Sequence, residues 1–333
     1  MGFKEEGQIN FIFIFTIACL LMVIIFLLSI ILGSAEINIQ TIINAIFNYD
    51  STDMNHNIIV DIRIPRDIGA LLVGMALAVS GAGIQSVTRN SLADPGLIGL
   101  NSGAALALAL TYAFLPTVSF SMLIFTSFLG AMIGGTMVIM IGRSRRDGFN
   151  PIRLILAGAA VSALLSALSQ AIALYFRLNQ SITFWSSGGV SGTTWEQLYI
   201  GFPVVIIVIV MFILISRQLS ILNLGESVAK GLGQNVKLIQ VFTMLLSMML
   251  AGIAVAIVGQ VAFVGLMIPH IARFLVGTDY KKVIPLTVVL GGSLVVAADT
   301  VARLMGEAPV SAIISFIGVP YFLYLIKKGG QTI

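Results

Sequence analysis

The sequence FIFIFTIACLLMVIIFLLSIIL, residues 11–32, is a continuous run that contains no charged residue. The hydrocarbon core of a bilayer is about 30 Å thick, and a helix that rises about 1.5 Å per residue needs about 20 residues to cross it. A secretory signal has a shorter apolar region, of about 7–15 residues. We therefore expect an uncleaved membrane span. Its Cys19 is the only cysteine, which excludes an intramolecular disulfide and a cysteine-based metal cluster.

The rest of the chain repeats this pattern. The 333 residues are 58% hydrophobic and 10% charged, with a mean hydropathy of +1.05, which is more apolar than a soluble core of this length requires. We predict an all-α integral membrane protein of one domain, residues 1–333, with about ten transmembrane helices. The predicted spans after Phe11–Leu32 are Ile68–Val87, Pro95–Leu115, Val118–Ile141, Ile152–Phe176, Leu198–Ile215, Leu238–Gly259, Val261–Val276, Val283–Ala302 and Val310–Ile326.

The distribution of positive charge predicts the orientation of these spans. With ten spans, all but four of the 18 Lys and Arg residues lie on the side of the two termini. Cytoplasmic loops carry the excess of Lys and Arg, so both termini are predicted to be cytoplasmic. The four exceptions are Arg63, Arg66, Arg177 and Arg303. Because the basic residues are spread over short connections, the net charge of +4 indicates membrane topology and not nucleic-acid binding.

Several kinds of chemistry are missing from the sequence. It contains no Gly-Lys pair, so it has no phosphate-binding loop of the G-x-x-x-x-G-K-[ST] type. The middles of the predicted spans are nearly free of the ionisable groups that proton- or ion-coupled carriers use. The two histidines, His56 and His270, fall on opposite sides of the predicted membrane. We therefore expect no catalysis, no metal site and no cofactor in this chain, and an energy source in a partner.

Three groups of motifs carry a resemblance to a known family. The first is RIPR at 63–66, with SGAGIQ at 80–85 and TRNSLADPG at 88–96. The second is GLMIPHIAR at 265–273 with ADTVAR at 298–303, and the third is LGESVAKGLG at 224–233. Together they closely resemble the iron-siderophore and vitamin B12 permease family, except that Ser91 stands where the family usually has proline. The resemblance implies the fold of a type II ABC importer permease.

A polar gap at residues 217–237 divides the apolar runs and is cytoplasmic by its charge. Its centre is compatible with a short surface helix that ends at Gly231 or Gly233. The resemblance implies that this gap is the coupling segment that seats in the ATPase subunit; an ordinary loop is the alternative. The coupling residues would be Leu224, Gly225, Glu226, Ser227, Ala229, Leu232 and Gly233.

Three outer arginines are candidates for docking a partner. Similar permeases use arginines at the positions of Arg63, Arg66 and Arg303 to engage glutamates of the substrate-binding protein. The planar guanidinium can grip a carboxylate through two hydrogen bonds. The alternatives are interfacial snorkelling or an internal pair, for example of Arg303 with Asp299.

Two further groups are candidate parts of the pathway. Ser162, Ser166 and Ser169 share one face of the fifth span, which the resemblance places along the translocation path; small residues that simply allow close helix packing are the alternative. The connection before the sixth span contains Phe184, Trp185, Gly188, Gly189 and Trp195. Its tryptophans are typical of interfacial anchors, whereas the resemblance implies an outer gate at Trp185, Gly188 and Gly189.

The predicted function is that of a multi-pass permease in the cell membrane of a bacterium. Two such subunits, identical or homologous, would enclose a pathway, with a cytoplasmic ABC ATPase dimer that uses ATP and an external binding protein that delivers the ligand. Ferric siderophores are the expected cargo, with a small preference for hydroxamates from the likeness around Ser80–Gly99. Haem and cobalamin stay open as cargo, and an ion-coupled secondary carrier is the rival from another class.

Overall fold

A computed structural model describes residues 2–33, 37–115, 117–144, 148–149, 151–186 and 188–329. Each predicted apolar run overlaps one long helix. The helices of the first half are α1 (Gly2–Ile31), α4 (Ile64–Thr88), α5 (Leu100–Phe114), α6 (Phe120–Gly142) and α7 (Pro151–Tyr175). Those of the second half are α9 (Trp195–Leu214), α12 (Val236–Val258), α13 (Val264–Val276), α14 (Tyr280–Leu304) and α15 (Val310–Gly329).

Shorter elements join these helices at the two ends of the bundle. One end of the bundle is the one that the charge distribution predicts to be outer, and it is called the outer end below. At this end lie α2 (Ile39–Phe47), α3 (Met54–Asn57), a π-helical turn η1 (Ile58–Arg63) and α8 (Asn179–Ser186). Toward the other end lie α10 (Ser216–Asn223) and α11 (Glu226–Gly231), and a 3₁₀ turn, η2 (Pro95–Ile98), precedes α5. One pair of two-residue antiparallel strands, β1 (Arg143–Ser144) and β2 (Gly148–Phe149), is a small exception to the all-α prediction.

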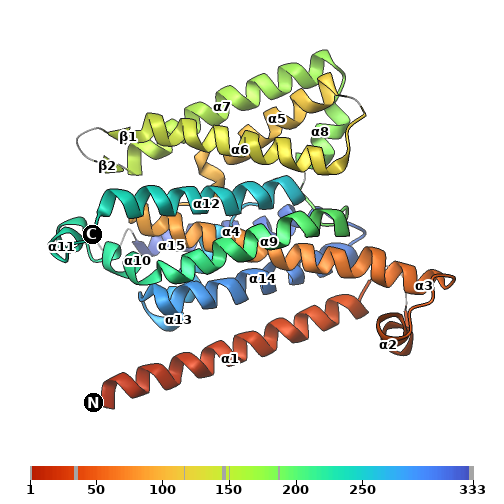
Figure 1. Cartoon of the computed structure of the whole chain (residues 1–333), viewed down its shortest axis with the longest axis horizontal. Coiled ribbons are helices and arrows are strands. Elements are labelled where there is room, and N and C mark those ends of the chain that lie inside the picture. Colours follow the sequence, from red (N-terminus) through yellow and green to blue (C-terminus); the bar gives the residue numbers. More distant parts are fainter. Residues whose placement is uncertain are drawn as a thin grey trace.

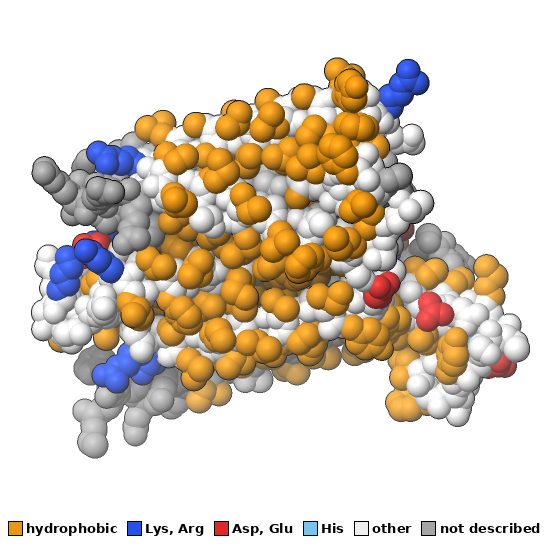
Figure 2. Space-filling model, turned by 45° about the horizontal axis from the view of Figure 1, so that its top comes forward, with side chains coloured by type: hydrophobic (Ala, Val, Ile, Leu, Met, Phe, Trp, Pro, Cys, Tyr) orange, Lys and Arg blue, Asp and Glu red, His pale blue; other side chains and the backbone are white. Residues whose placement is uncertain are grey.

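The lengths of the helices agree with a membrane protein. Within the described residues, seven helices are long and apolar enough to cross a bilayer, and α5, α13 and α15 are shorter apolar helices. The helix α1 begins and α15 ends at the same end of the bundle (Figure 1). Hydrophobic side chains cover the length of the bundle in the space-filling view (Figure 2), as is expected of a surface that faces lipid.

The helix α4 forms the centre of the molecule and α1 lies at its edge. In the apolar window of the α4 segment 83% of the residues are buried, against 6% in α1. Glycines permit this dense packing: a Cβ atom on Gly74 would collide with the backbone of Gly291 on α14, and one on Gly81 with the backbone of Gly265 on α13. Helices with small residues at their crossings can approach closely. The residues at both ends of α4 are therefore held by several neighbours.

The third predicted span needs a correction. It was expected to begin at Pro95, whereas the regular helix begins at Leu100 after η2 and a left-handed Gly99 with a φ of 74°. Asp94 caps the turn η2 by accepting a hydrogen bond from the Gly96 amide at 2.7 Å. Because apolar residues also fill such a turn, hydropathy alone does not locate the first residue of the helix.

Candidate functional site

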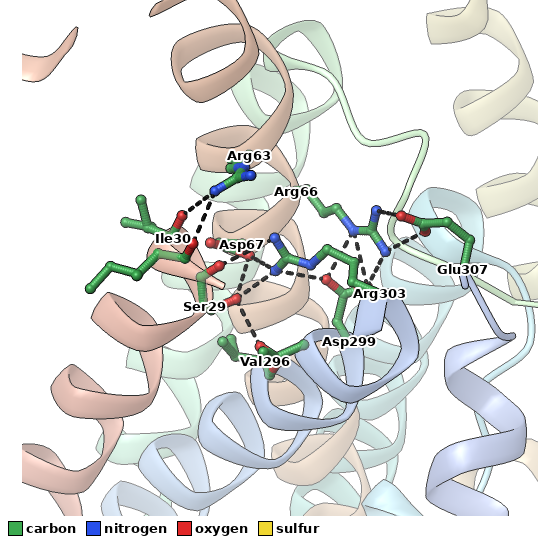
Figure 3. A network of polar contacts seen from close by, with 11 residues as sticks. Ser29, Ile30, Arg63, Arg66, Asp67, Val296, Asp299, Arg303 and Glu307 are labelled. Atoms are coloured by element: carbon green, nitrogen blue, oxygen red, sulfur yellow. Dashed lines mark hydrogen bonds and ion pairs between the residues drawn. The ribbon is translucent and has the colours of Figure 1, made fainter. Parts of the chain in front are cut away.

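The outer end of α4 carries an arginine that is bound by two carboxylates. Arg66 donates from Nε and Nη2 to the two carboxylate oxygens of Asp299 on α14, at 2.9–3.1 Å. Its Nη1 and Nη2 also donate to Glu307, at 3.0 and 2.8 Å, in the turn between α14 and α15 (Figure 3). The arginine fork is thus bidentate toward both partners, the geometry in which guanidinium–carboxylate contacts are strongest.

A second buried pair extends this network to α1. Arg303 forms a close ion pair with Asp67 and a further one with Asp299, where Nη2 lies 3.1 Å from Oδ2. The hydroxyl of Ser29 on α1 donates to Asp67 at 2.8 Å (Figure 3). The hydroxyl of Thr300 donates to that of Ser29 at 2.9 Å. Residues far apart in the sequence therefore tie α1, α4 and α14 together.

The third outer arginine, Arg63, binds the last carbonyl groups of the first helix. Arg63 donates from Nη1 to the backbone carbonyls of Ile30 and Ile31, at 2.8 and 3.2 Å. The last carbonyls of a helix have no partner within it, and a cationic side chain there satisfies them and favours the negative end of the helix dipole. Arg63 therefore fastens the end of α1 to the start of α4.

This geometry bears on the docking prediction. Arg63, Arg66 and Arg303 are 4%, 6% and 5% exposed, so each is buried in this chain. The internal pair of Arg303 with Asp299, the alternative considered for the sequence, is present. Engagement of a partner by these arginines stays a prediction, and it requires that the outer end of the bundle opens enough to expose them.

Among the carboxylates of the outer network, Glu307 is the one that reaches the surface, with a side chain that is 48% exposed. Its backbone is left-handed, with a φ of 63°, a conformation that is uncommon for a residue with a side chain. Hydrogen bonds from Arg66 hold the pKa of the Glu307 carboxyl below its ordinary value, against an opposing effect of partial burial. Glu307 therefore stays charged at neutral pH and completes the pairing of Arg66.

At its other end, α4 contacts the predicted coupling segment. Arg89 ends the helix in a left-handed conformation with a φ of 48°, and its Nη2 lies 3.6 Å from Oε1 of Glu226 on α11. Lys230 lies 3.6 Å from the other oxygen of Glu226, and Gln240 on α12 donates to Oε1 at 3.1 Å. All three charged side chains are partly exposed, at 33–63%. This cluster is looser than the outer network.

The coupling segment contains the short helix that the sequence predicts. Helix α11 ends at Gly231, Leu232 follows as its C-cap, and Gly233 is left-handed with a φ of 78°. The predicted coupling residues divide into two sets: Ala229 is fully buried against the bundle, whereas Leu224 and Leu232 are 67% and 65% exposed. Apolar side chains that protrude from a polar end are typical of a surface that binds another protein. Docking to an ATPase stays a prediction.

One turn before Arg89, Gln85 joins three separate segments, and the sequence analysis missed it. Its amide nitrogen donates to the carbonyl oxygens of Ala93 at 3.1 Å, Gly265 at 3.1 Å and Leu266 at 3.3 Å. Its oxygen accepts from Arg273 on α13 at 2.6 Å. The side chain is 3% exposed. A buried amide with both ends bonded holds its neighbours in one arrangement.

The segment that Gln85 holds turns back into the bundle. A Cβ atom on Gly265 would lie 2.6 Å from the Pro95 ring and 2.9 Å from the carbonyl oxygen of Leu77. Pro95 thus lies at the level of Leu77, about 16 Å along α4 from its end at Thr88, at about 1.5 Å per residue. Irregular backbone is tolerated at this depth only where protein surrounds it. The Gln85 amide contributes to that environment.

The serines of the fifth span face another helix of this chain. Ser166 lies 3.1 Å from the hydroxyl of Ser102, and Ser169 donates to the carbonyl of Ala105 at 3.2 Å, both on α5. Ser162 is partly buried on the same side. This arrangement agrees with the packing alternative, while a role in the translocation path stays a prediction.

The candidate outer gate contains the helix α8. The amide of Gly189 donates to the carbonyl of Val258 at 2.8 Å, and Gly188 is left-handed with a φ of 69°, its Cα close to Gly259. Trp195 donates from its indole to the carbonyl of Val60 at 2.9 Å, and the side chain of Phe184 lies outside the described part. The connection is therefore tied to the end of α12, whereas gating by Trp185, Gly188 and Gly189 stays a prediction.

A metal site was also sought among the residues that the structure describes. Within the described ranges, no group of three His, Cys, Asp or Glu side chains could hold a metal ion. His270 packs its ring edge-on to Tyr321, with 6.1 Å between the ring centres. His270 therefore packs against α15 in this arrangement.

Comparison with known proteins identifies the family of the chain. A model of the FecCD transport family matches residues 21–328. The chain belongs to the FecCD transport family. It is 45% identical over 313 residues to the iron(3+)-hydroxamate import system permease protein FhuB of Bacillus subtilis, covering 93% of this chain and 81% of that protein. It is also 35% identical over 317 residues to the hemin transport system permease protein HmuU of Yersinia pestis, covering 93% of each.

A solved structure shares the fold of this FecCD protein. It is described as a metal-chelate type ABC transporter in an inward-facing conformation, with a TM-score of 0.82, 30% identity and coverage of 95% of this chain and 99% of that one. The family and the fold predicted from the motifs are therefore confirmed. As a FecCD protein with membrane-spanning helices, the chain is a permease-type transport subunit and not an enzyme.

Proposed function

We propose that this chain is the permease subunit of an ATP-driven, binding-protein-dependent importer that carries ferric siderophores across the cell membrane of a bacterium. The observation that supports the cargo best is the 45% identity to a hydroxamate permease over 93% of the chain. Ferric hydroxamates are therefore the favoured ligands. The likeness to a hemin permease keeps haem as the second candidate. The iron complex is cargo, and this chain would hold no cofactor of its own.

The energy would come from ATP hydrolysis in a separate cytoplasmic ATPase dimer. The exposed Leu224 and Leu232 would contact that partner, and Ala229 would fix α11 to the bundle. A movement of α11 would reach α4 through the contact of Glu226 with Arg89. From there it would reach the returning segment and α13 through Gln85. These contacts give alternating access a mechanical route through the chain.

A second permease subunit, identical or homologous, would complete the pathway, and an extracytoplasmic binding protein would deliver the ligand to the outer end. At that end Arg66 already engages Asp299 and Glu307. A carboxylate of the binding protein would have to compete with these partners or join them. Once the outer end has opened and the pair is exposed to water, it contributes only about 0–1 kcal/mol, so it would orient the partner more than hold it.

Uptake measurements test this proposal. Cells with and without the chain would be offered labelled iron on a hydroxamate, on a catecholate and as haem, with labelled cobalamin alongside. We expect loss of hydroxamate uptake alone in cells that lack the chain, and loss of uptake in wild-type cells when ATP is depleted. Uptake that followed a proton or sodium gradient in ATP-free vesicles would instead support a secondary carrier. Loss of haem uptake alone would assign the second candidate cargo.

A further inference from the structure

The outer helix α2 has an exposed apolar face that the transport mechanism does not use. It spans nine residues, Ile39–Phe47, and contains no charged side chain. In Figure 1 it is seen end-on, while α1 and the bundle helices run across the picture. The axis of α2 therefore lies across the direction in which the bundle crosses the membrane, at the outer end of α1.

The side chains of α2 form three separate faces. Successive residues of a helix point about 100° apart. One face, Ile42 and Ala45, is buried in a cluster with Ile30 at the end of α1 and Ile59 in η1. A second face is polar and exposed and consists of Gln40 and Asn44, and the exposed C-cap residue Asn48 follows at the end of the helix. The third is apolar and exposed.

The third face contains the largest unburied side chains of this helix. Ile39, Ile43 and Ile46 are 56%, 51% and 51% exposed, and Phe47 is 78% exposed. At 100° per residue these four side chains share one third of the helix circumference, between the buried face and the polar face. In Figure 2 hydrophobic side chains also lie on the outer lobe that projects beyond the bundle. Such a face costs free energy in water, so something apolar is expected to cover it.

Lipid is the occupant that the surroundings favour. The adjoining α1 has only 6% of its window buried and exposes Leu27, Leu28 and Leu32 near its outer end. The apolar face of α2 continues this surface at the place where the span ends. A helix that lies in the plane of a bilayer is expected to have one apolar side toward the acyl chains and one polar side toward water. The three faces of α2 meet that requirement, with the protein core as the third neighbour.

We propose that α2 lies in the outer interface of the membrane, with Ile39, Ile43, Ile46 and Phe47 inserted at the boundary between lipid headgroups and acyl chains. The helix would then fix the depth of the outer charged network in the bilayer. Its buried face packs on Ile30, next to Ser29 of that network, and the Ile30 carbonyl accepts from Arg63. This inference rests on the membrane fold of the chain and not on its cargo.

Site-specific labelling tests this location in the whole chain. Because Cys19 is the only cysteine, Cys19→Ala provides a background into which Ile43→Cys and Asn44→Cys are introduced. Both positions are exposed, adjacent and on the same helix, so Asn44 is the matched control. Each variant is labelled with an environment-sensitive fluorophore and reconstituted in phosphatidylcholine vesicles. One series contains lipid with a nitroxide near the top of the acyl chain, and another contains a water-soluble quencher.

We expect the lipid nitroxide to quench the Ile43 label at least threefold more than the Asn44 label, and the aqueous quencher to show the opposite order. The pair Phe47→Cys and Asn48→Cys repeats the comparison at the end of the helix. Equal quenching at Ile43 and Asn44 would overturn the proposal. So would an Ile43 label that is open to water in vesicles and becomes covered only when a binding protein or a second permease is added, because the occupant would then be protein.

Discussion

The two ends of α4 contain the same kinds of residue in opposite settings. At the outer end, Arg66 and Arg303 contact Asp67, Asp299 and Glu307, and all of these side chains except Glu307 are at most 7% exposed. At the other end Arg89 and Lys230 lie 3.6 Å from Glu226, and these side chains are 33–63% exposed. Burial and the number of contacts, rather than residue type, separate the two clusters.

This difference indicates different roles. Charges that are taken out of water must stay paired, because an unpaired buried charge is strongly unfavourable. The outer network therefore holds α1, α4 and α14 in one arrangement. Exposed charges exchange partners with water at little cost, since each pair contributes only about 0–1 kcal/mol. The cluster around Glu226 can therefore break and re-form during a transport cycle, which suits a region that a partner moves.

The largest effect is expected from breaking the outer network. Arg303→Met removes the ion-pair partner of Asp67 and leaves a buried carboxylate, so it should lower the free energy of unfolding by about 3–5 kcal/mol. Unfolding of the purified chain in mixed detergent, followed by tryptophan fluorescence, measures this change. Arg177→Met is the control, since Arg177 is an exposed arginine. The double variant Arg303→Met with Asp67→Asn should recover part of the loss. A cost no greater than that of the control would contradict the structural role.

An intermediate effect is expected at Gln85, which lies between the two clusters. Gln85→Leu keeps the approximate size but leaves Arg273 and the carbonyls of Ala93 and Gly265 without their contact. Unsatisfied buried polar groups cost about 1–3 kcal/mol. Hydrogen exchange measured by mass spectrometry should become faster in residues 90–99 and 264–273. Gln170→Leu is the control, because Gln170 is exposed on α7. Exchange that rose equally throughout the chain would show that Gln85 has no specific holding role.

The smallest effect on stability, together with a clear effect on the coupling of ATP hydrolysis to transport, is expected at the end of the bundle that is predicted to be cytoplasmic. Arg89→Glu and Glu226→Arg should each change the free energy of unfolding by about 1 kcal/mol or less. Each should also raise the amount of ATP hydrolysed per iron complex transported by at least threefold, because the contact between α11 and α4 becomes repulsive. The double variant restores opposite charges and should recover most of the coupling. The measurement is transport and hydrolysis by the complete importer in proteoliposomes.

The control for the charge swap is Lys281→Glu, which changes an exposed charge at the same end of the bundle. If the wild-type complex transports iron with ATP and the swapped variants match it, the route through Arg89 is wrong. If the wild-type complex shows no ATP-driven transport, the proposed function fails instead. The two failures are therefore distinguishable.

Higher salt should weaken the contact of Arg89 with Glu226 and leave the outer network nearly unchanged, because buried pairs are screened less.

The sequence by itself determined the helical architecture, for a reason that concerns single segments. Each apolar run had to satisfy its own backbone hydrogen bonds in lipid, and a helix does so within about 20 residues. The ten helices could therefore be predicted from the ten apolar runs without information on how the helices pack. The short helix before Gly231 was predictable on the same grounds, since glycine after a polar helix is a local end signal. The family followed from contiguous motifs, such as RIPR at 63–66 and GLMIPHIAR at 265–273.

Only the tertiary structure decided which charged and polar residues on different helices meet. Arg66 and Asp299 are separated by 233 positions, and Gln85 and Arg273 by 188. No periodicity in the sequence encodes such a pair, although Asp67, directly after Arg66, was a sign that charge at this end could be neutralised internally. The sequence also did not predict that residues 90–99 return into the bundle. Nor did it predict that α2 lies across the axis of the bundle. Hydropathy reports how much each segment prefers lipid, whereas a partner across the bundle depends on how all the helices pack.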